Sequence, residues 1–151
     1  MQDIIDRFTG LYDFLSNFYM CPVPYVRNDD GHGPLSEPTY YRSVEHIYQA
    51  LKAMNNEDFE RIAKCNTAGD AKRMGRTVHI RKDWEDIKVD VMRKLVMAKF
   101  SHNLDLWGRL RATGNAIIIE GNWWGDKFWG IHNGEGENWL GKILMEVRNV
   151  R

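Results

Sequence analysis

The apolar residues of this chain change their spacing at Ser43, and that change indicates the fold class. Before Ser43, aromatic and β-branched residues alternate with prolines around a polar Gly/Pro loop at 27–38, which is typical of short strands that pair across a turn. After Ser43, apolar residues recur every three or four positions, as they do in helices. This order predicts an α+β fold: a single, mostly helical domain with a small β-sheet.

The longest predicted helix covers residues 83–102. Its apolar positions recur at spacings of three and four, which is typical of a packed amphipathic helix; they are Trp84, Ile87, Val91, Leu95 and Ala98. Shorter helices are expected over 56–65, 67–76 and 104–114, a buried strand over 116–120, and a last helix over 138–150 that Asn138 opens as N-cap.

Composition sets limits on function. The 151 residues suit one domain, 1–151, with its own core. Lys plus Arg equals Asp plus Glu at 21 each, so no net field attracts nucleic acid or an anionic membrane. Cys21 and Cys65 lack metal or redox spacing, and no apolar run could act as a leader or span a bilayer. We therefore expect a soluble, cytoplasmic monomer without membrane association, metal or cofactor.

The segment "SVEHIYQALKAM", 43–54, has one apolar face. On a helical wheel, that face is formed by Val44, Ile47, Leu51 and Met54, which we expect in the core, with Tyr48 at its edge. His46 points the other way and is expected at the surface.

Two charges of the same segment lie along one rim of its apolar face. Glu45 and Lys52 are two turns apart beside Tyr48, with Gln49 just outside, and their Cα atoms would be about 10 Å apart. That distance suits a small molecule approached from both ends. The alternative is a solvated pair in which Glu45 interacts with the positive end of the helix dipole.

The segment "EGNWWGDKFWGI", 120–131, combines three tryptophans, a phenylalanine, three glycines and one aspartate. Glycines destabilise regular elements, so an ordered loop is expected. Exposed indoles are unusual without a binding role. The aromatic residues therefore either cover the end of a core or form a binding wall.

Four segments together resemble the NADAR domain family, which includes the YbiA-like N-glycosidases. They are "FTGLYDFLSNFY", "SVEHIYQALKA", "AKRMGR" and "WWGDKFWGIHNGEGENWLGKILMEVR", and they occur in the family's order along nearly the whole chain. The resemblance implies an enzyme that breaks the bond between ribose C1 and an amine nitrogen. Its substrate is either a ribosylamino intermediate of riboflavin synthesis or an ADP-ribosylated guanine, free or within DNA or RNA.

The resemblance also assigns site residues. It implies Lys52, Glu45 and Asp126 as catalytic residues, and a pocket of aromatic and polar residues around them. The predicted substrate-binding residues are Asn17, Phe18, Tyr48, Gln49, Arg73, Trp84, Trp124 and Gly125.

The chemistry suits these residue types. A ribose on an exocyclic amine can open to an imine, which an unprotonated lysine can attack, and burial lowers a lysine's pKa toward that state. Family members are thought to form such a lysine Schiff base. Glu45 would move protons, and Asp126 would orient water or ribose hydroxyls. An indole could stack the leaving base, which favours a binding role for Trp124; Trp129 and Trp139 are expected in the core.

Phosphate contacts are less clearly indicated. Lys72, Arg73 and Arg76 are candidate phosphate partners, although a solvated basic helix end explains them equally well. The glycines of "HNGEGEN" could expose backbone amides, but the neighbouring glutamates would repel a phosphate. Two rival functions remain: a non-catalytic reader of ADP-ribose or a nucleobase, and an interaction module with a Trp-rich surface.

Overall fold

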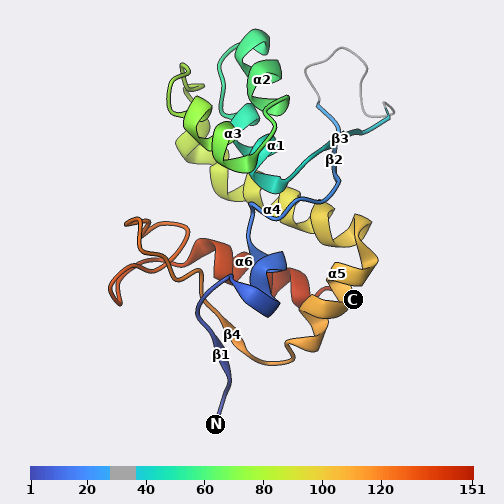
Figure 1. The fold of residues 1–151 in the computed structure, drawn as a ribbon, viewed down its shortest axis with the longest axis vertical. Helices are drawn as coiled ribbons and strands as arrows, with labels where there is room; N and C mark the ends of the chain where they lie inside the picture. Colours follow the sequence, from blue (N-terminus) through green and yellow to red (C-terminus); the bar gives the residue numbers. More distant parts are fainter. Residues whose placement is uncertain (28–36) are drawn as a thin grey trace. The chain divides into compact units, whose positions relative to one another are not determined.

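The computed structural model describes residues 1–27 and 37–151, so most of the predicted Gly/Pro loop lies outside the described residues. Contacts within the chain divide it into two compact units. Unit 1 comprises Met1–Ser16 and Leu104–Arg151, and unit 2 comprises Asn17–Asn103. Helices predominate over short strands in the described part (Figure 1), which confirms the α+β class.

Unit 2 contains four helices and a strand pair among its described residues. Strand β2 (Val23–Tyr25) pairs antiparallel with β3 (Thr39–Tyr41), as expected for strands on either side of the polar loop. The helices are α1 (Val44–Leu51), α2 (Asn56–Ala63), α3 (Ala68–Gly75) and α4 (Trp84–His102). Figure 1 shows α1, α2 and α3 grouped on one side of the long α4.

Polar caps explain where three of these helices begin. The side chains of Ser43, Asn55 and Thr67 each accept a hydrogen bond from a backbone N–H three residues later, at 3.1, 2.8 and 3.0 Å. Such caps satisfy amides that have no partner within the helix.

Helix α1 is buried along its whole length, because α2, α3 and α4 all contact it. The expectation that His46 lies at the surface is therefore wrong. His46 is fully buried, with Nδ1 2.7 Å from Ser43 Oγ and Nε2 2.9 Å from the Cys65 carbonyl. Burial lowers the pKa of its imidazole.

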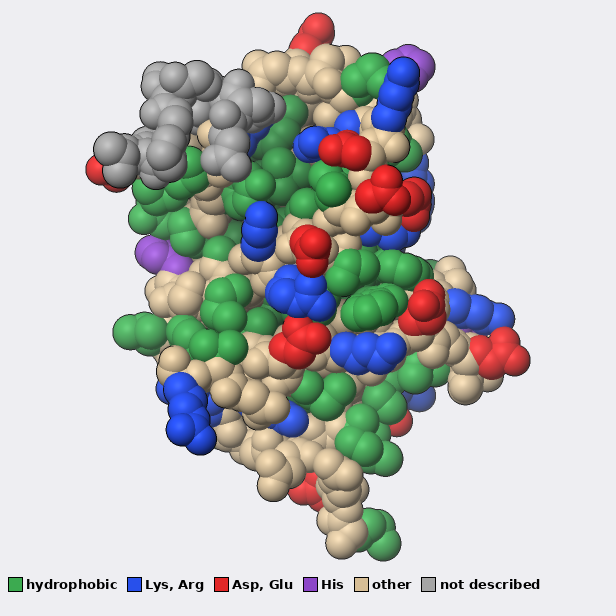
Figure 2. All heavy atoms as spheres, turned by 180° about the vertical axis from the view of Figure 1, so that it is seen from behind, with side chains coloured by type: hydrophobic (Ala, Val, Ile, Leu, Met, Phe, Trp, Pro, Cys, Tyr) green, Lys and Arg blue, Asp and Glu red, His purple; other side chains and the backbone are tan. Residues whose placement is uncertain are grey.

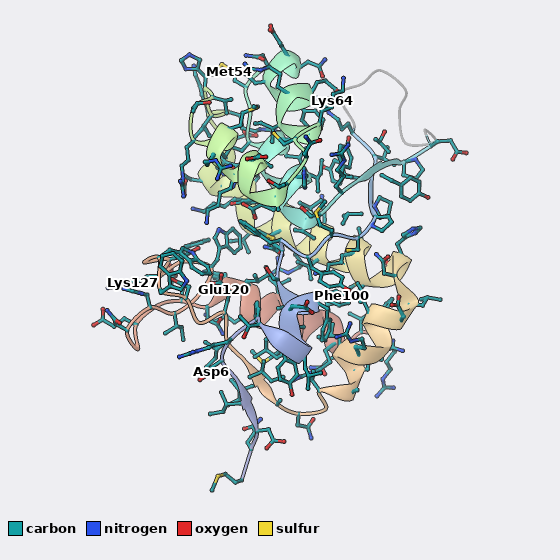
Figure 3. All side chains as sticks on the ribbon, viewed as in Figure 1. Asp6, Met54, Lys64, Phe100, Glu120 and Lys127 are labelled. Atoms are coloured by element: carbon teal, nitrogen blue, oxygen red, sulfur yellow. The ribbon has the colours of Figure 1, made fainter. Side chains whose placement is uncertain are left out.

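Met54 is the second correction to the helical wheel. Helix α1 ends at Leu51, three residues before Met54, and the chain then pairs Ala53 with Ile80. Met54 therefore leaves the apolar face and is exposed at the edge of unit 2 (Figure 3).

Helix α4 has a wider buried face than its predicted apolar positions. It contacts both α1 and β2, so Met92, Val96 and Phe100 are buried as well.

Unit 1 consists of short elements around one apolar core. Strand β1 (Ile4–Ile5) pairs in parallel with β4 (Ile117–Ile118), so the strand predicted at 116–120 is only two residues long. The unit also contains the 3-10 helix η1 (Gly10–Leu15) and helices α5 (Leu104–Ala112) and α6 (Trp139–Arg148).

Asn138 precedes α6 as predicted but does not cap it with its side chain. Its backbone is left-handed, with φ 56°, and its amide bridges the β4 side of the unit. Nδ2 donates to the Ile118 carbonyl at 3.0 Å, and Oδ1 accepts from Glu120 N at 3.0 Å. The side chain of Asn138 therefore ties the start of α6 to the β4 side, while its carbonyl accepts a hydrogen bond from Lys142 N in the first turn at 3.0 Å.

Acidic and basic side chains are interspersed on the face shown in Figure 2. This distribution agrees with the equal numbers of the two signs in the sequence. Over the described residues, no helix combines the length and apolar character that crossing a bilayer would require.

Candidate active site

Glu45 lies at the centre of the predicted site in unit 2. Its side chain is buried, at 7% exposure, in the first turn of α1. Its Oε1 accepts a hydrogen bond of 2.8 Å from Nε2 of Gln49, one turn later. Its backbone N–H donates to the carbonyl of Asn17 at 3.0 Å, and the Asn17 amide is buried against Met92 Sδ at 3.4 Å. Asn17 therefore fixes the backbone at Glu45, and Gln49 fixes its carboxylate.

Lys52 is the C-cap residue of the same helix and is half-buried. Its carbonyl accepts a hydrogen bond from Arg81 N at 3.0 Å, which holds the helix end. Burial lowers the pKa of its amine; Glu45 opposes this shift, and the cations Arg76 and Lys72 add to it. The balance favours the neutral amine relative to an ordinary exposed lysine.

An aromatic pair lies beside these charges. The rings of Tyr48 and Trp84 are 5.1 Å apart at a tilt of 49°, and both residues are buried. Trp84 is placed by the first turn of α4, where its backbone N–H donates to the Arg81 carbonyl at 3.2 Å. Phe18 is more exposed, and Lys72 Nζ lies 5.6 Å from its ring centroid.

The basic residues of α3 have different surroundings. Arg73 is exposed and forms an ion pair with Asp70, one turn earlier. Lys72 in α3 and Arg76 at its C-cap are the cations whose charges act on Lys52. Lys72 and Arg76 therefore affect the pKa of Lys52, whereas Arg73 is not among the charges that shift it.

The predicted residues of unit 1 lie on the loop between β4 and α6. Trp123 and Trp124 are 84% and 48% exposed, and their rings meet edge to face at 5.7 Å. Phe128 stacks edge to face with Trp129 at 4.8 Å and lies 6.4 Å from Trp139. Trp129 and Trp139 are partly buried rather than in the core as expected: each packs against the ring of Phe128, and Trp139 is the first residue of α6.

Asp126 organises this loop through its own hydrogen bonds. Its Oδ1 accepts from the backbone N–H groups of Phe128 and Trp129 at 3.0 and 2.9 Å. Asn122 holds the backbone of Asp126 on both sides, accepting from its N–H at 2.9 Å and donating to its carbonyl at 2.8 Å. Gly125, at φ 88°, supplies the left-handed turn between them. Glu120 and Lys127, both labelled in Figure 3, locate this loop.

The sequence reasoning missed the role of Asn122. Its position four residues before Asp126 in a Gly-containing segment was the available signal, because asparagine side chains often bond to nearby backbone in turns. Unit 2 contains eight of the predicted residues and unit 1 contains three: Asn17, Phe18, Glu45, Tyr48, Gln49, Lys52, Arg73 and Trp84 in unit 2, and Trp124, Gly125 and Asp126 in unit 1. No cluster of three potential metal ligands occurs in the part of the chain that the structure describes.

Comparison with known proteins identifies the family. The family model "NADAR domain" matches residues 7–150. The chain belongs to the NADAR domain family. The match includes every residue that the sequence analysis assigned to the site.

Several relatives are similar over most of the chain. The protein "N-glycosidase Npun_R5314" of Nostoc punctiforme is 37% identical, with 87% of this chain and 88% of the relative aligned. "N-glycosidase YbiA" of Escherichia coli is 36% identical over 98% of this chain and 89% of its own. "Riboflavin biosynthesis protein VVA0006" of Vibrio vulnificus is 37% identical over 91% of this chain but only 40% of its own length.

A solved structure confirms the fold. The NMR structure of the E. coli protein YbiA matches with a TM-score of 0.78 at 35% identity, covering 98% of this chain and 84% of that one.

Proposed function

We propose that this chain is an N-glycosidase that cleaves the bond between ribose C1 and the exocyclic amine of a base, through an imine on Lys52. The observation that carries the proposal is the pairing on α1 of a buried carboxylate, Glu45, with a half-buried lysine whose pKa is lowered by burial. The relatives named N-glycosidase, aligned over most of the chain, support the reaction class.

The reaction begins in the substrate's own ring. The ring oxygen leaves C1 as the nitrogen lone pair forms a C1=N bond, and C1 becomes electrophilic. Neutral Nζ of Lys52 adds to C1, and the bond from C1 to the base amine breaks as that amine takes up a proton. Water then adds to the lysine imine, and the C1–Nζ bond breaks to release the sugar aldehyde, which closes again. The sum consumes one water molecule.

Glu45 supplies the two proton transfers in this scheme. It gives a proton to the departing amine and takes one from the water that resolves the imine. Its burial and its hydrogen bond from Gln49 hold the carboxylate in one orientation along α1. The roles of Trp124 in stacking the base and of Asp126 in orienting water or ribose hydroxyls rest on the family resemblance and on the ordered geometry of their own loop.

We favour ADP-ribosylated guanine, as a nucleotide or within nucleic acid, as the substrate. The exposed indole of Trp124 suits a flat base. Lys72 and Arg76, whose charges reach Lys52, suit a phosphorylated ribose. The second candidate, a ribosylaminopyrimidine phosphate, is favoured by the Vibrio relative that is named for riboflavin biosynthesis.

The decisive experiment is separate incubation of the protein with a guanine-ADP-ribosylated oligonucleotide and with a ribosylaminopyrimidine phosphate. We expect release of ADP-ribose from the first, followed by mass spectrometry, and no release by Lys52→Ala. Turnover of the pyrimidine alone would select the second candidate. Tight binding of ADP-ribose without turnover of either substrate would contradict the enzyme and support a reader.

A further inference from the structure

The amide of Gln49 is buried, and its two ends have very different surroundings. The side chain is 7% exposed, and Nε2 donates to Glu45 Oε1 at 2.8 Å. The other end, Oε1, is buried without a hydrogen-bond partner among residues 1–27 and 37–151. Turning the amide over would place its oxygen against the oxygen of Glu45, and an ionised carboxylate has no proton to share. In its ionised form, Glu45 therefore fixes which way the amide points.

Gly75, the last residue of α3, lies against that unpartnered end. A Cβ added at Gly75 would collide with Gln49 Oε1 and would come within 3.0 Å of its amide carbon and 3.3 Å of its Cβ. Gly69, the other glycine of α3, shows no such conflict: a Cβ there meets only Thr67 Oγ1 at 3.9 Å and Arg73 Nη1 at 4.0 Å. Glycine is a poor helix former, so its presence at position 75 calls for a packing reason.

We propose that Gly75 and Gln49 are positioning residues for Glu45. The missing side chain at Gly75 leaves room for the Gln49 amide between α3 and α1, and the amide in turn holds the carboxylate of Glu45. This inference rests on the proposed function for the role of Glu45, while the contacts that carry it lie within unit 2. It gives the glycine of the "AKRMGR" segment a role at the site.

The contact between Gly75 and Gln49 predicts what a methyl group added at Gly75 would do. In Gly75→Ala the buried amide must move, because its oxygen would collide with the added Cβ. The hydrogen bond from Gln49 Nε2 to Glu45 Oε1 is then distorted or lost. Loss of a donor to a carboxylate favours its protonated form, so Glu45 should titrate at higher pH. A misplacement of about 1 Å in a catalytic group can reduce the rate about 10²-fold.

The test compares Gly75→Ala and Gln49→Met with Gly69→Ala as the matched control on the same helix. Two measurements are made on each full-length protein: the pH profile of kcat and KM, and the titration of the Glu45 carboxyl by ¹³C NMR. We expect Gly75→Ala and Gln49→Met to lower kcat roughly tenfold to 10²-fold with KM little changed, and to move the Glu45 midpoint to higher pH. Gly69→Ala should change neither quantity.

A double variant tests the coupling directly. In Gln49→Ala there is no amide to displace and only the 3.3 Å approach to Cβ remains, so adding Gly75→Ala should have much less effect than it has in the unmodified protein, whereas independent roles would give additive losses. Additivity, or an unchanged Glu45 midpoint in Gly75→Ala, would overturn the proposal. Should Gly75→Ala alone fail to fold, recovery of folding in the double variant would support the same contact, and failure to recover would contradict it.

The NMR titration separates this inference from the proposed function. If the unmodified protein turns over neither candidate substrate, the N-glycosidase proposal fails. The Glu45 midpoints of the variants still show whether Gly75 and Gln49 position the carboxylate.

Discussion

Helix α1 and the loop between β4 and α6 carry most of the residues of the proposed reaction, and they are held in different ways. The side chains of α1 are buried by neighbouring helices; Glu45 is buried among them, and Lys52 at the helix end is half-buried. The loop is held by hydrogen bonds among its own residues, chiefly those of Asn122 and Asp126, and it exposes Trp123 and Trp124. Burial lowers the pKa of a lysine, whereas an indole that stacks a ligand must be accessible.

This difference predicts that variants of the two regions lose activity in different ways. Substitutions on α1 should affect the chemical step, because the buried groups there change protonation state during the reaction. Substitutions on the loop should affect how the base, the ribose or the attacking water is held, and Asp126 should also affect kcat through its charge.

The largest effect is expected for Lys52→Ala. Turnover should be abolished while the fold is kept, since the amine makes the covalent bond and a half-buried residue at the helix end contributes little packing. Lys52→Arg should not restore activity, because a guanidinium stays protonated. Borohydride added during turnover should trap a sugar adduct on the unmodified protein, detected by intact mass. Active turnover without any adduct would contradict the imine.

Asp126 should give the next largest effect, and two substitutions separate its roles. Asp126→Asn keeps an oxygen that can accept from Phe128 N and Trp129 N, so the loop should persist while kcat falls by up to about 10²-fold through loss of the charge. Asp126→Ala also removes the two bonds, at a cost of about 0.5–2 kcal/mol if they behave like helix caps.

Amide exchange of the loop distinguishes the two Asp126 variants. We expect protection to be kept in Asp126→Asn and lost in Asp126→Ala. Equal kcat for Asp126→Asn and the unmodified protein would assign Asp126 to loop structure alone.

Local patterns in the sequence predicted more than long-range contacts. Apolar periodicity predicted helices within a few residues of α1, α2 and α3, whereas the one cap that was predicted, Asn138, does not cap α6 with its side chain. The placement of Glu45 and Lys52 two turns apart also follows from helical spacing. A helical wheel gives relative directions only, so it could not show that helices surround α1 and bury His46. The contact of Gly75 with Gln49 joins two helices and leaves no periodic trace in the sequence.

Trp124→Ala should weaken ligand binding by about 1–3 kcal/mol, the usual range for stacking of a base on an aromatic side chain. Trp123→Ala is the matched control: Trp123 is more exposed and meets Trp124 edge to face, so its loss should have a smaller effect. Fluorescence quenching on titration with ADP-ribose or a guanine nucleotide measures both affinities. Unchanged affinity in Trp124→Ala with a lowered Tm would instead support the interpretation that these residues only cover a core.

The smallest expected effect concerns the charges around Lys52. Its pKa is lowered first by burial, and Arg76 adds to that shift. Removing the cation in Arg76→Gln should stabilise the protonated amine, so the pKa of Lys52 rises and the neutral fraction at pH 7 falls. In a plot of kcat/KM against pH, the part that rises with pH should move to higher pH by less than about one pH unit.

Two controls show whether that movement comes from the charge of Arg76. Arg76 is exposed, so its influence should diminish as salt is added. Arg73→Gln removes a cation that is paired with Asp70 and is not among the charges acting on Lys52. It should leave the rising part of the plot in place even if it weakens phosphate binding. An equal displacement in both variants would mean that the rising part reports general surface charge, and the low pKa of Lys52 would then depend on its burial in α1 alone.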